Sequence, residues 1–318
     1  MLRHTFLYLS ERPALKDLVL RFQFAEDMAR RFVAGETLDE AIQVVRELNG
    51  DGLLVTLDHV GEHVLSRQDA ERATATYLHI FDQIDRTGVD ANVSLKLTQL
   101  GLDLGDDVAY ENLRRILEHA RECRSSVEVD MEGSAYTQRT LDIHCRLREA
   151  GFDNVGAVVQ AYLYRTEADV ERLIQSCTEP SRSDGSKIRL CKGAYDEPPE
   201  IAFPDKADVD RNYVRLTRML FSPTARERGV VPAIATHDEK MIDAAKDAAR
   251  RNGVAPEAFE FQMLYGIRSE LQQRLADEGH QMRVYVPYGT EWYPYFMRRM
   301  AERPANVMFV ARAVLRRN

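Results

Sequence analysis

From residue 52 onward, short runs rich in apolar and β-branched residues recur along the chain, and a longer, mixed apolar and polar segment follows each run. Short runs of this composition predict strands, and the longer segments predict helices. The eight predicted strands are Gly52–Asp58, Asn92–Leu97, Ser126–Met131, Val155–Gln160, Lys187–Lys192, Val231–Thr236, Phe259–Leu264 and Arg283–Pro287.

Two of the intervening segments have clear helical patterns. In Asp107–Glu122, apolar residues recur at close to the 3.6-residue period of a helix. These residues are Val108, Leu113, Ile116, Leu117 and Ala120. The segment Asp238–Val254 carries Gly253 near its end, which suits the C-terminal cap of a helix.

Eight alternating strand and helix units in about 250 residues indicate an α/β protein with a TIM-type (β/α)8 barrel. A doubly wound sheet is the main alternative, although eight parallel strands would be many for that fold. Residues 1–50 contain no strand candidate, and segments 15–35 and 37–49 look helical. We therefore predict an N-terminal helical segment, 1–50, packed on a barrel domain, 51–318.

The composition narrows the class of protein. Of 318 residues, 44% are hydrophobic and 30% are charged, and the formal net charge is −8. That charge, without any Lys/Arg-rich block, argues against nucleic-acid binding. The N-terminus lacks the pattern of a signal peptide, and no apolar run is long enough to span a membrane. The four cysteines are scattered without a CxxC motif, so we expect reduced thiols in a cytoplasmic protein.

Polar or charged residues lie on or just after almost every predicted strand. In a barrel of this type, functional residues collect at the C-terminal ends of the strands. The residues are Asp58, His59, Glu62, Lys96, Asp130, Glu132, Gln160, Tyr162, Arg189, Lys192, Tyr195, Thr236, His237, Glu260, Gln262 and Tyr285. Unpaired buried ions cost on the order of several kcal/mol each, so a site explains this set better than plain packing.

Taken singly, several of these residues also have a structural interpretation. Lys96 can extend to the barrel rim, and Asp130 can cap the next helix. Thr236 can cap a helix beside a structural His237, or it can help to hold a phosphate. Arg189 would repel the nearby Lys192 unless an anion lies between the two cations.

Motifs exclude some kinds of chemistry and leave others open. The sequence has no HxH, HExxH or cysteine cluster, so we expect no metal. It also lacks GxSxG and, after the first strand, GxGxxG. A lysine near a barrel strand end suits a Schiff-base aldolase, with Lys96 or Lys192 as the nucleophile. A barrel that binds a small anion or amino acid without turnover is a second alternative.

The segment after the eighth predicted strand combines aromatic residues with two adjacent arginines. On a helix, Trp292, Tyr295, Arg299 and Glu302 share one face, and Arg298 lies about 100° away from Arg299. If the helix crosses the barrel mouth, both guanidiniums can reach one carboxylate, and Glu302 can hold them when the site is empty. The alternative is a partly buried helix with a solvated charged edge.

Seven motifs, in order, resemble those of the proline dehydrogenase family. They are SLKLTQLGL, VDMEGSAYT, VVQAYLYRT, RLCKGAY, ATHDEKMI, FEFQMLYGIR and YVPYGTEWYPYFMRRMAERPANVMFV. The similarity runs from about Gly52 to Phe309, and RLxKGAY together with YxPxG and RRxxE is specific to this family. The length is similar to that of the monofunctional bacterial type. The sequence departs from other members at Met131–Ser134, after the aspartate, and residues 1–50 match weakly.

This resemblance implies a distorted (β/α)8 barrel with non-covalent FAD at the C-terminal ends of its strands. The implied reaction oxidises L-proline to Δ1-pyrroline-5-carboxylate by hydride transfer from C5 to flavin N5. Electrons then pass to a membrane quinone, in the first step of proline catabolism to glutamate. Hydroxyproline is the alternative substrate within the family. We expect a cytoplasmic protein, peripheral at the inner face of the cell membrane, with a transient contact to pyrroline-5-carboxylate dehydrogenase.

The resemblance also assigns substrate positions. Arg298, Arg299 and Lys96 correspond to the residues that hold the proline carboxylate. Tyr285 corresponds to the tyrosine that packs on the substrate ring, and Tyr295 corresponds weakly to one that crowds it. In the family, a glutamate after the first strand forms an ion pair with the first arginine and gates the site, which implies Glu62 as the partner of Arg298. Glu302 is a second carboxylate beside the two arginines.

Asp130 and Arg189 match the active-site aspartate and arginine of the family, with Arg189 near flavin N5. Arg189, with Lys192, would stabilise the reduced anionic flavin. No side chain is assigned as the base for the amine proton. The positions that match flavin contacts are Met131, Gln160, Arg189, Lys192, Gly193, Ala194, Thr236 and His237.

Overall fold

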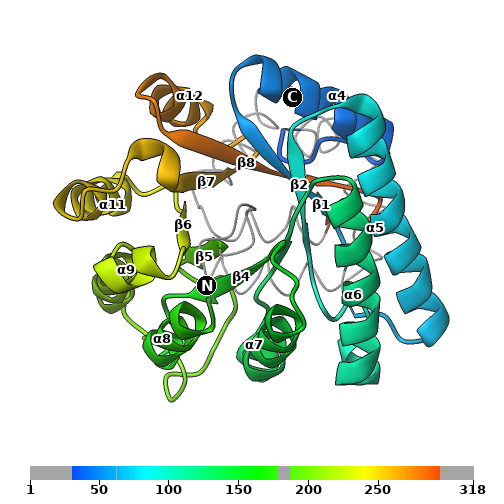
Figure 1. Ribbon diagram of the computed structural model, residues 1–318, viewed down its shortest axis with the longest axis horizontal. Coiled ribbons are helices and arrows are strands. Elements are labelled where there is room, and N and C mark those ends of the chain that lie inside the picture. The colour runs from blue at the N-terminus through cyan, green and yellow to red at the C-terminus, as the bar shows by residue number, and fades with distance from the viewer. Residues whose placement is uncertain (1–30, 62, 178–186, 294–318) are drawn as a thin grey trace, which may run out of the picture.

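The structure is a computed structural model, and it describes residues 31–61, 63–177 and 187–293. Eight parallel strands in these ranges close into a barrel in sequence order, with the last strand paired to the first (Figure 1). They are β1 Leu54–His59, β2 Ala91–Leu95, β3 Val127–Val129, β4 Val155–Gln160, β5 Lys187–Cys191, β6 Val231–Ala235, β7 Glu260–Leu264 and β8 Gln281–Tyr288. The predicted barrel and all eight predicted strands are confirmed, with bounds that differ by a few residues.

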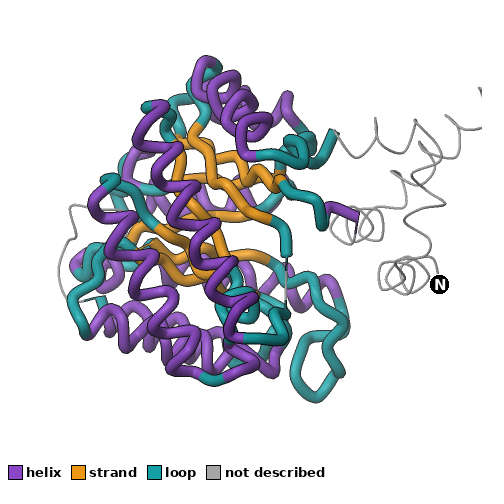
Figure 2. The backbone as a smooth tube through the Cα atoms, turned by 90° about the vertical axis from the view of Figure 1, so that its right-hand side faces the viewer, coloured by secondary structure: helices purple, strands orange, loops and turns teal. Residues whose placement is uncertain are grey.

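Helices lie around the outside of the barrel and cover it (Figures 1 and 2). The described α-helices are α4 Leu38–Gly50, α5 Arg67–Thr87, α6 Asp106–Glu122, α7 Ser134–Glu149, α8 Thr166–Ser176, α9 Lys206–Leu220, α10 Pro223–Glu227, α11 Glu239–Arg251 and α12 Ser269–Asp277. Within the described ranges, no helix is both long and apolar enough to cross a membrane.

Local sequence explains where individual helices begin and end. The Ser66 hydroxyl caps α5 by accepting a hydrogen bond from the Asp69 amide, and Gly88 ends this helix with a φ of 66°. Helix α11 ends at Arg251, and Gly253 follows with a φ of 63°. A positive φ favours glycine, which explains the predicted end of that helix.

The described part of the N-terminal segment packs beside β8. Helix α4 contacts both β1 and β8 and begins with a capping box formed by Thr37 and Glu40. Just before it, the Ala34 amide donates to the Pro287 carbonyl oxygen at 2.9 Å. The indole of Trp292 donates to the Glu36 carboxylate at 3.0 Å. The structure therefore joins residues that precede the barrel to the end of its last strand.

Four charged side chains fill the interior of the barrel near its N-terminal end, and we call them the ionic layer: Glu128, Lys187, Glu260 and Arg283. Each is at most 4% exposed. The Glu260 carboxylate lies 3.1 Å from Lys187 Nζ and 3.0 Å from Arg283 Nε. Two positive and two negative charges therefore balance one another among buried side chains, which is the condition for burying ions.

This layer corrects one part of the sequence analysis. Glu260 and Gln262 were grouped with the residues of a strand-end site, but Glu260 begins β7. Gln262 donates hydrogen bonds to Glu260 and Glu128 inside the barrel. The two residues therefore belong to the buried interior, because side chains two apart on a strand point to the same face.

Candidate active site

Asp130 connects three strands at the C-terminal end of the barrel. Its carboxylate accepts hydrogen bonds from Arg189 Nη1 at 2.6 Å, Ser94 Oγ at 2.6 Å and the Tyr285 hydroxyl at 2.7 Å. The Arg189 guanidinium also lies over the Tyr285 ring, 5.4 Å from its centroid. The structure thus brings together Asp130, Arg189 and Tyr285, which the sequence predicted as site residues.

Lys96 lies between two carboxylates at the same end of the barrel. Its Nζ atom is 3.6 Å from Asp58 Oδ1 and 3.9 Å from Asp130 Oδ2. Asp58 is 1% exposed, and burial raises the pKa of its carboxyl although Lys96 acts in the opposite direction. We call Asp58, Lys96, Asp130, Arg189 and Tyr285 the mouth cluster.

Arg189 joins the mouth cluster to the ionic layer. Its Nη2 atom lies 2.8 Å from the Glu128 carboxylate, on the side away from Asp130. Burial disfavours the charge on Arg189, but Glu128 and Asp130 outweigh burial and raise the pKa of the guanidinium. Burial likewise disfavours the charged form of Glu128, but Arg189 and Lys187 outweigh it and lower its pKa to about 2. Both groups are therefore charged at neutral pH.

Lys192 has its own carboxylate partners after β5. Its ammonium pairs with Asp210 on α9 and, at 2.8 Å, with Asp238. Burial opposes ionisation of the two aspartates, but Lys192 outweighs it and lowers their pKa. The repulsion expected between Lys192 and Arg189 is thus relieved by separate protein carboxylates.

The other predicted flavin-contact positions lie at or just after the C-terminal ends of β3, β4, β5 and β6. Thr236 Oγ1 accepts a hydrogen bond from the Asp238 amide at 3.1 Å. His237 Nε2 accepts one from the Leu264 amide at 3.0 Å, which places the proton of the neutral ring on Nδ1. Gln160 Nε2 donates to the Glu132 carbonyl oxygen at 2.9 Å.

The remaining contact positions are in the chain segments after β3 and β5. Met131 is buried after β3, and Ala194 follows Gly193 in the segment after β5. Gly193 has a φ of 110°, and a Cβ atom there would come within 2.2 Å of the Tyr162 ring. This close contact requires glycine whether or not a cofactor is bound.

Five predicted residues lie outside the described ranges: Glu62, Tyr295, Arg298, Arg299 and Glu302. Trp292 and Tyr293, which precede most of them, are buried directly after β8.

Four residues that contact the predicted site residues were missed from the sequence: Ser94, Glu128, Asp210 and Asp238. Ser94 and Glu128 each lie two residues before a predicted site residue, so strand alternation could have found them. Asp210 offers no such signal, because it lies on a helix and meets Lys192 only through the folded barrel.

The described residues suit a flavin. Arg189 Nε is buried and forms no hydrogen bond with a described residue. A flavin ring presents nitrogen and carbonyl oxygen acceptors to which buried donors of this kind can bind. Within the described ranges, no group of three or more His, Cys, Asp or Glu residues is arranged to hold a metal ion.

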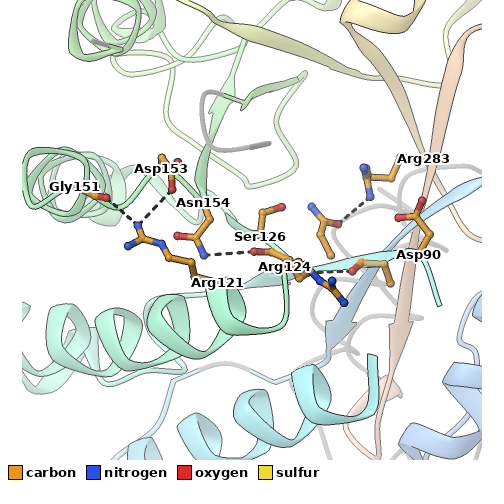
Figure 3. A pocket seen from close by; sticks show the side chains of 11 residues that line it. Asp90, Arg121, Arg124, Ser126, Gly151, Asp153, Asn154 and Arg283 are labelled. Carbon is orange, nitrogen blue, oxygen red and sulfur yellow. Dashed lines mark hydrogen bonds and ion pairs between the residues drawn. The ribbon is translucent and has the colours of Figure 1, made fainter. Parts of the chain in front are cut away.

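A cavity of about 770 Å³ opens at the opposite, N-terminal end of the barrel (Figure 3). Its lining includes residues at or before the starts of β2, β3 and β4, together with Arg283 of β8. At its wall, Arg121 donates to the Gly151 carbonyl oxygen and to Asp153. No residue of the mouth cluster lines this cavity, and functional sites of such barrels lie at the other end, so we place the candidate site at the mouth.

Known proteins resemble this chain over nearly its whole length. A family model described as proline dehydrogenase matches residues 41–312. Proline dehydrogenase 2 of Bacillus subtilis (strain 168) is 41% identical over 315 residues, which cover 99% of each chain. The proline dehydrogenase of Deinococcus radiodurans is 38% identical and covers 99% of this chain and 98% of its own.

A solved structure also resembles this barrel. It is the crystal structure of proline utilization A from Bdellovibrio bacteriovorus inactivated by N-propargylglycine. The match has a TM-score of 0.79 at 27% identity, and it covers 87% of this chain and 32% of that protein. The chain therefore corresponds to about a third of that larger protein.

Proposed function

The chain belongs to the proline dehydrogenase family, and we propose that it oxidises L-proline to Δ1-pyrroline-5-carboxylate with FAD bound non-covalently at the barrel mouth. Proline dehydrogenase is an oxidoreductase activity, and the family membership supports that activity for this chain. The observation that carries the finer proposal is the mouth cluster, in which Asp130 fixes Arg189 and leaves its buried Nε atom as a donor.

The substrate carboxylate is held by cations in this proposal. Lys96 extends from the end of β2 into the mouth, and Arg298 and Arg299 are its proposed partners from the C-terminal segment. A charge-assisted hydrogen bond contributes about 1.5–3 kcal/mol, so three cations would fix a small zwitterion firmly. The position of Lys96 supports this assignment.

The substrate ring packs on Tyr285. Its hydroxyl donates to Asp130, and its ring lies under the Arg189 guanidinium, so two contacts fix the plane of the ring. A fixed aromatic ring excludes water and orients an apolar pyrrolidine. Tyr295 is proposed to crowd the same ring from the C-terminal segment.

Arg189 is the proposed neighbour of the cofactor ring. When bound, FAD supplies the two-electron acceptor that the side chains of the chain cannot provide. Glu128 and Asp130 hold the guanidinium charged and fixed from two sides, so its positive charge is preorganised before substrate arrives. Gln160, Met131, Lys192, Gly193, Ala194, Thr236 and His237 are proposed to contact the cofactor.

We extend the proposal to the electron acceptor and the cellular location. Electrons would pass to a membrane quinone, in the first step of proline catabolism to glutamate. The chain would be cytoplasmic and associate peripherally with the inner face of the cell membrane. A transient contact with pyrroline-5-carboxylate dehydrogenase would pass on the unstable product. Flotation with liposomes at low salt tests the membrane contact. A protein that stays at the bottom of the gradient would contradict the proposed membrane association.

The alternative functions gain no support. Lys192 Nζ donates hydrogen bonds to both Asp210 and Asp238, and it would have to leave these carboxylates to attack a carbonyl. Relatives that match over their full length are described as proline dehydrogenases, which supports proline over hydroxyproline.

An anaerobic visible spectrum of the purified protein, taken before and after L-proline is added, tests the proposal. We expect flavin bands that bleach with proline. Bands that bleach only with hydroxyproline would change the substrate, and a protein that stays colourless after FAD is added would contradict the flavin assignment. N-propargylglycine, which inactivates the similar protein from Bdellovibrio bacteriovorus, should also inactivate this one.

A further inference from the structure

We propose that Asp58 takes up a proton when the substrate carboxylate binds beside Lys96, so that substrate binding and proton uptake are coupled at the barrel mouth. The inference rests on the proposed function, because it takes Lys96 as a ligand of the substrate carboxylate. In the balanced step, one proton from solvent joins the Asp58 carboxylate, and no electron moves.

Asp58 differs from the other carboxylate of the mouth cluster. The carboxylate of Asp130 accepts three hydrogen bonds from neighbouring side chains. The Oδ1 atom of Asp58 is buried and accepts no hydrogen bond from a described residue. Its nearest described cation is Lys96, at 3.6 Å, which is longer than a hydrogen bond. Lys96 is therefore the main group that favours the charged form of Asp58, and the Tyr285 hydroxyl and His59 contribute less.

The other titratable groups around Asp58 affect its pKa less than Lys96 does, or in the opposite direction. They are His59 on its own strand, Asp130 after β3, Tyr77 on α5, and Tyr285 and Tyr288 on β8. Burial lowers the pKa of His59, so this ring is neutral at neutral pH. Burial raises the pKa of all three tyrosines, which are neutral too. Asp130 carries a like charge and opposes ionisation of Asp58.

A substrate carboxylate on Lys96 changes this balance. It brings a further negative charge to the ammonium that stabilises Asp58, within a site where water is excluded. The pKa of Asp58 then rises above its value in the free enzyme, and the group binds a proton at any pH between the two values. Uptake disappears well above and well below that window, because the protonation state is then the same before and after binding.

Calorimetric titration of the FAD-loaded protein with cyclopentanecarboxylate tests the coupling. This probe has the ring and carboxylate of proline but no amine, so it supplies no proton of its own at neutral pH. Binding heats in buffers of different ionisation enthalpy give the number of protons taken up, between about pH 5.5 and about pH 8. We expect uptake of up to about one proton per site, with a maximum above the ordinary pKa of an aspartate, because burial raises the pKa of Asp58.

Two variants locate the proton. Asp58→Asn should bind the probe without this proton uptake, and Asp130→Asn should retain the uptake. Asp169→Asn is the matched control, because Asp169 is also a buried carboxylate with a cation partner, Arg165, but lies on α8 outside the barrel. It should behave as the wild type.

The outcomes separate the two proposals. Probe binding without proton uptake overturns the inference, and so does unchanged uptake in Asp58→Asn. If Asp58→Asn does not fold, the wild type and Asp130→Asn decide, and loss of uptake in Asp130→Asn would assign the proton to Asp130. Failure of the probe to bind an enzyme that turns over proline overturns the inference alone. A protein that neither binds nor oxidises proline contradicts the proposed function instead.

Discussion

At the scale of single residues, Gly193 shows how closely the mouth is packed. Its φ of 110° is unfavourable for other residues, and the Tyr162 ring occupies the space of a side chain. Gly193→Ala should therefore lower the free energy of unfolding through two contributions. Backbone strain accounts for about 1–3 kcal/mol, and overpacking against Tyr162 accounts for about 1–3 kcal/mol more. Urea unfolding measures the loss.

Gly151→Ala is the control for this change. Gly151 has a φ of 87° but open space around its Cα atom, so only the backbone contribution applies. Equal losses in the two variants would show that Tyr162 does not restrict residue 193.

His144 on α7 makes stability depend on pH. Burial, followed by the charge of Arg148, lowers the pKa of its imidazole to about 4, and a hydrogen bond to the Val155 carbonyl acts against them. In the unfolded chain a histidine titrates near pH 6.5, so between these values the unfolded state binds more protons. The stability contributed by neutral His144 is thus lost as pH falls from about 6.5 to about 4, by about 3 kcal/mol.

His144→Gln should reduce this acid sensitivity, which denaturant unfolding at several pH values will measure. His79→Gln, at an exposed histidine, is the control and should keep the dependence of the wild type. An unchanged slope in His144→Gln would contradict the assignment.

The proposed carboxylate clamp predicts a kinetic effect. Arg298→Met or Arg299→Met should raise the KM for proline about 10- to 100-fold, since each removes a charge-assisted contact of about 1.5–3 kcal/mol. The flavin bands should remain. Arg303→Met, at an arginine outside the RRxxE pair, is the control. If both clamp variants keep the affinity of the wild type, the clamp assignment is wrong.

The sequence predicted these residues unevenly. The strand-end pattern placed Asp130, Arg189, Lys96 and Tyr285 among a larger set of candidates, and the resemblance to proline dehydrogenase singled them out. The structure brings the four together. The residues that pair with the predicted site residues were missed. Asp210, for example, lies on a helix 18 residues after Lys192, and no local pattern links the two. Glu128 was missed although strand alternation places it on the same face as Asp130.

At the scale of elements, the ionic layer links β3, β5, β7 and β8 through charge. Lys187→Met would leave Glu128 and Glu260 with less positive charge between them, so we expect a loss of about 3–5 kcal/mol in stability. Urea unfolding would show it, and the double variant with Glu260→Gln should recover part of the loss.

Lys246→Met provides the comparison for this layer. Lys246 pairs with Glu278 at the surface, between α11 and the end of α12, and such pairs contribute about 0–1 kcal/mol. A similar small loss in Lys187→Met would mean that the interior charges are not tightly coupled.

The helices and strands were predicted from the sequence more completely than the contacts of single residues. Apolar runs separated by helical patterns leave few arrangements other than a barrel, and Gly253 marked the end of α11. The short helix α10 and the ionic layer were not predicted. Both depend on contacts between strands and helices that a local pattern does not contain.

At the scale of the whole molecule, the barrel closes by pairing its first and last strands. The register runs from Leu54 opposite Arg283 to His59 opposite Tyr288, and Arg283 also donates to the Val55 carbonyl oxygen, 228 residues away. Trp292 is the only tryptophan of the sequence and bonds to Glu36 at this junction. Its fluorescence therefore reports closure.

After dilution from urea, Trp292 fluorescence should recover more slowly than far-ultraviolet circular dichroism. Helices form from local contacts, whereas closure needs contacts between distant parts of the chain. Stopped-flow traces recorded with both probes provide the measurement. Coincident single phases would show that closure and helix formation are one event.

The order of the strands has a consequence for synthesis on the ribosome. Glu260 emerges before Arg283, and β1 emerges long before its partner β8. A nascent chain that ends at His280 therefore has two open sheet edges and a carboxylate without its guanidinium. Open edges invite pairing with other chains. The last strand pairs with both β1 and β7, so both edges stay open until β8 has left the ribosome.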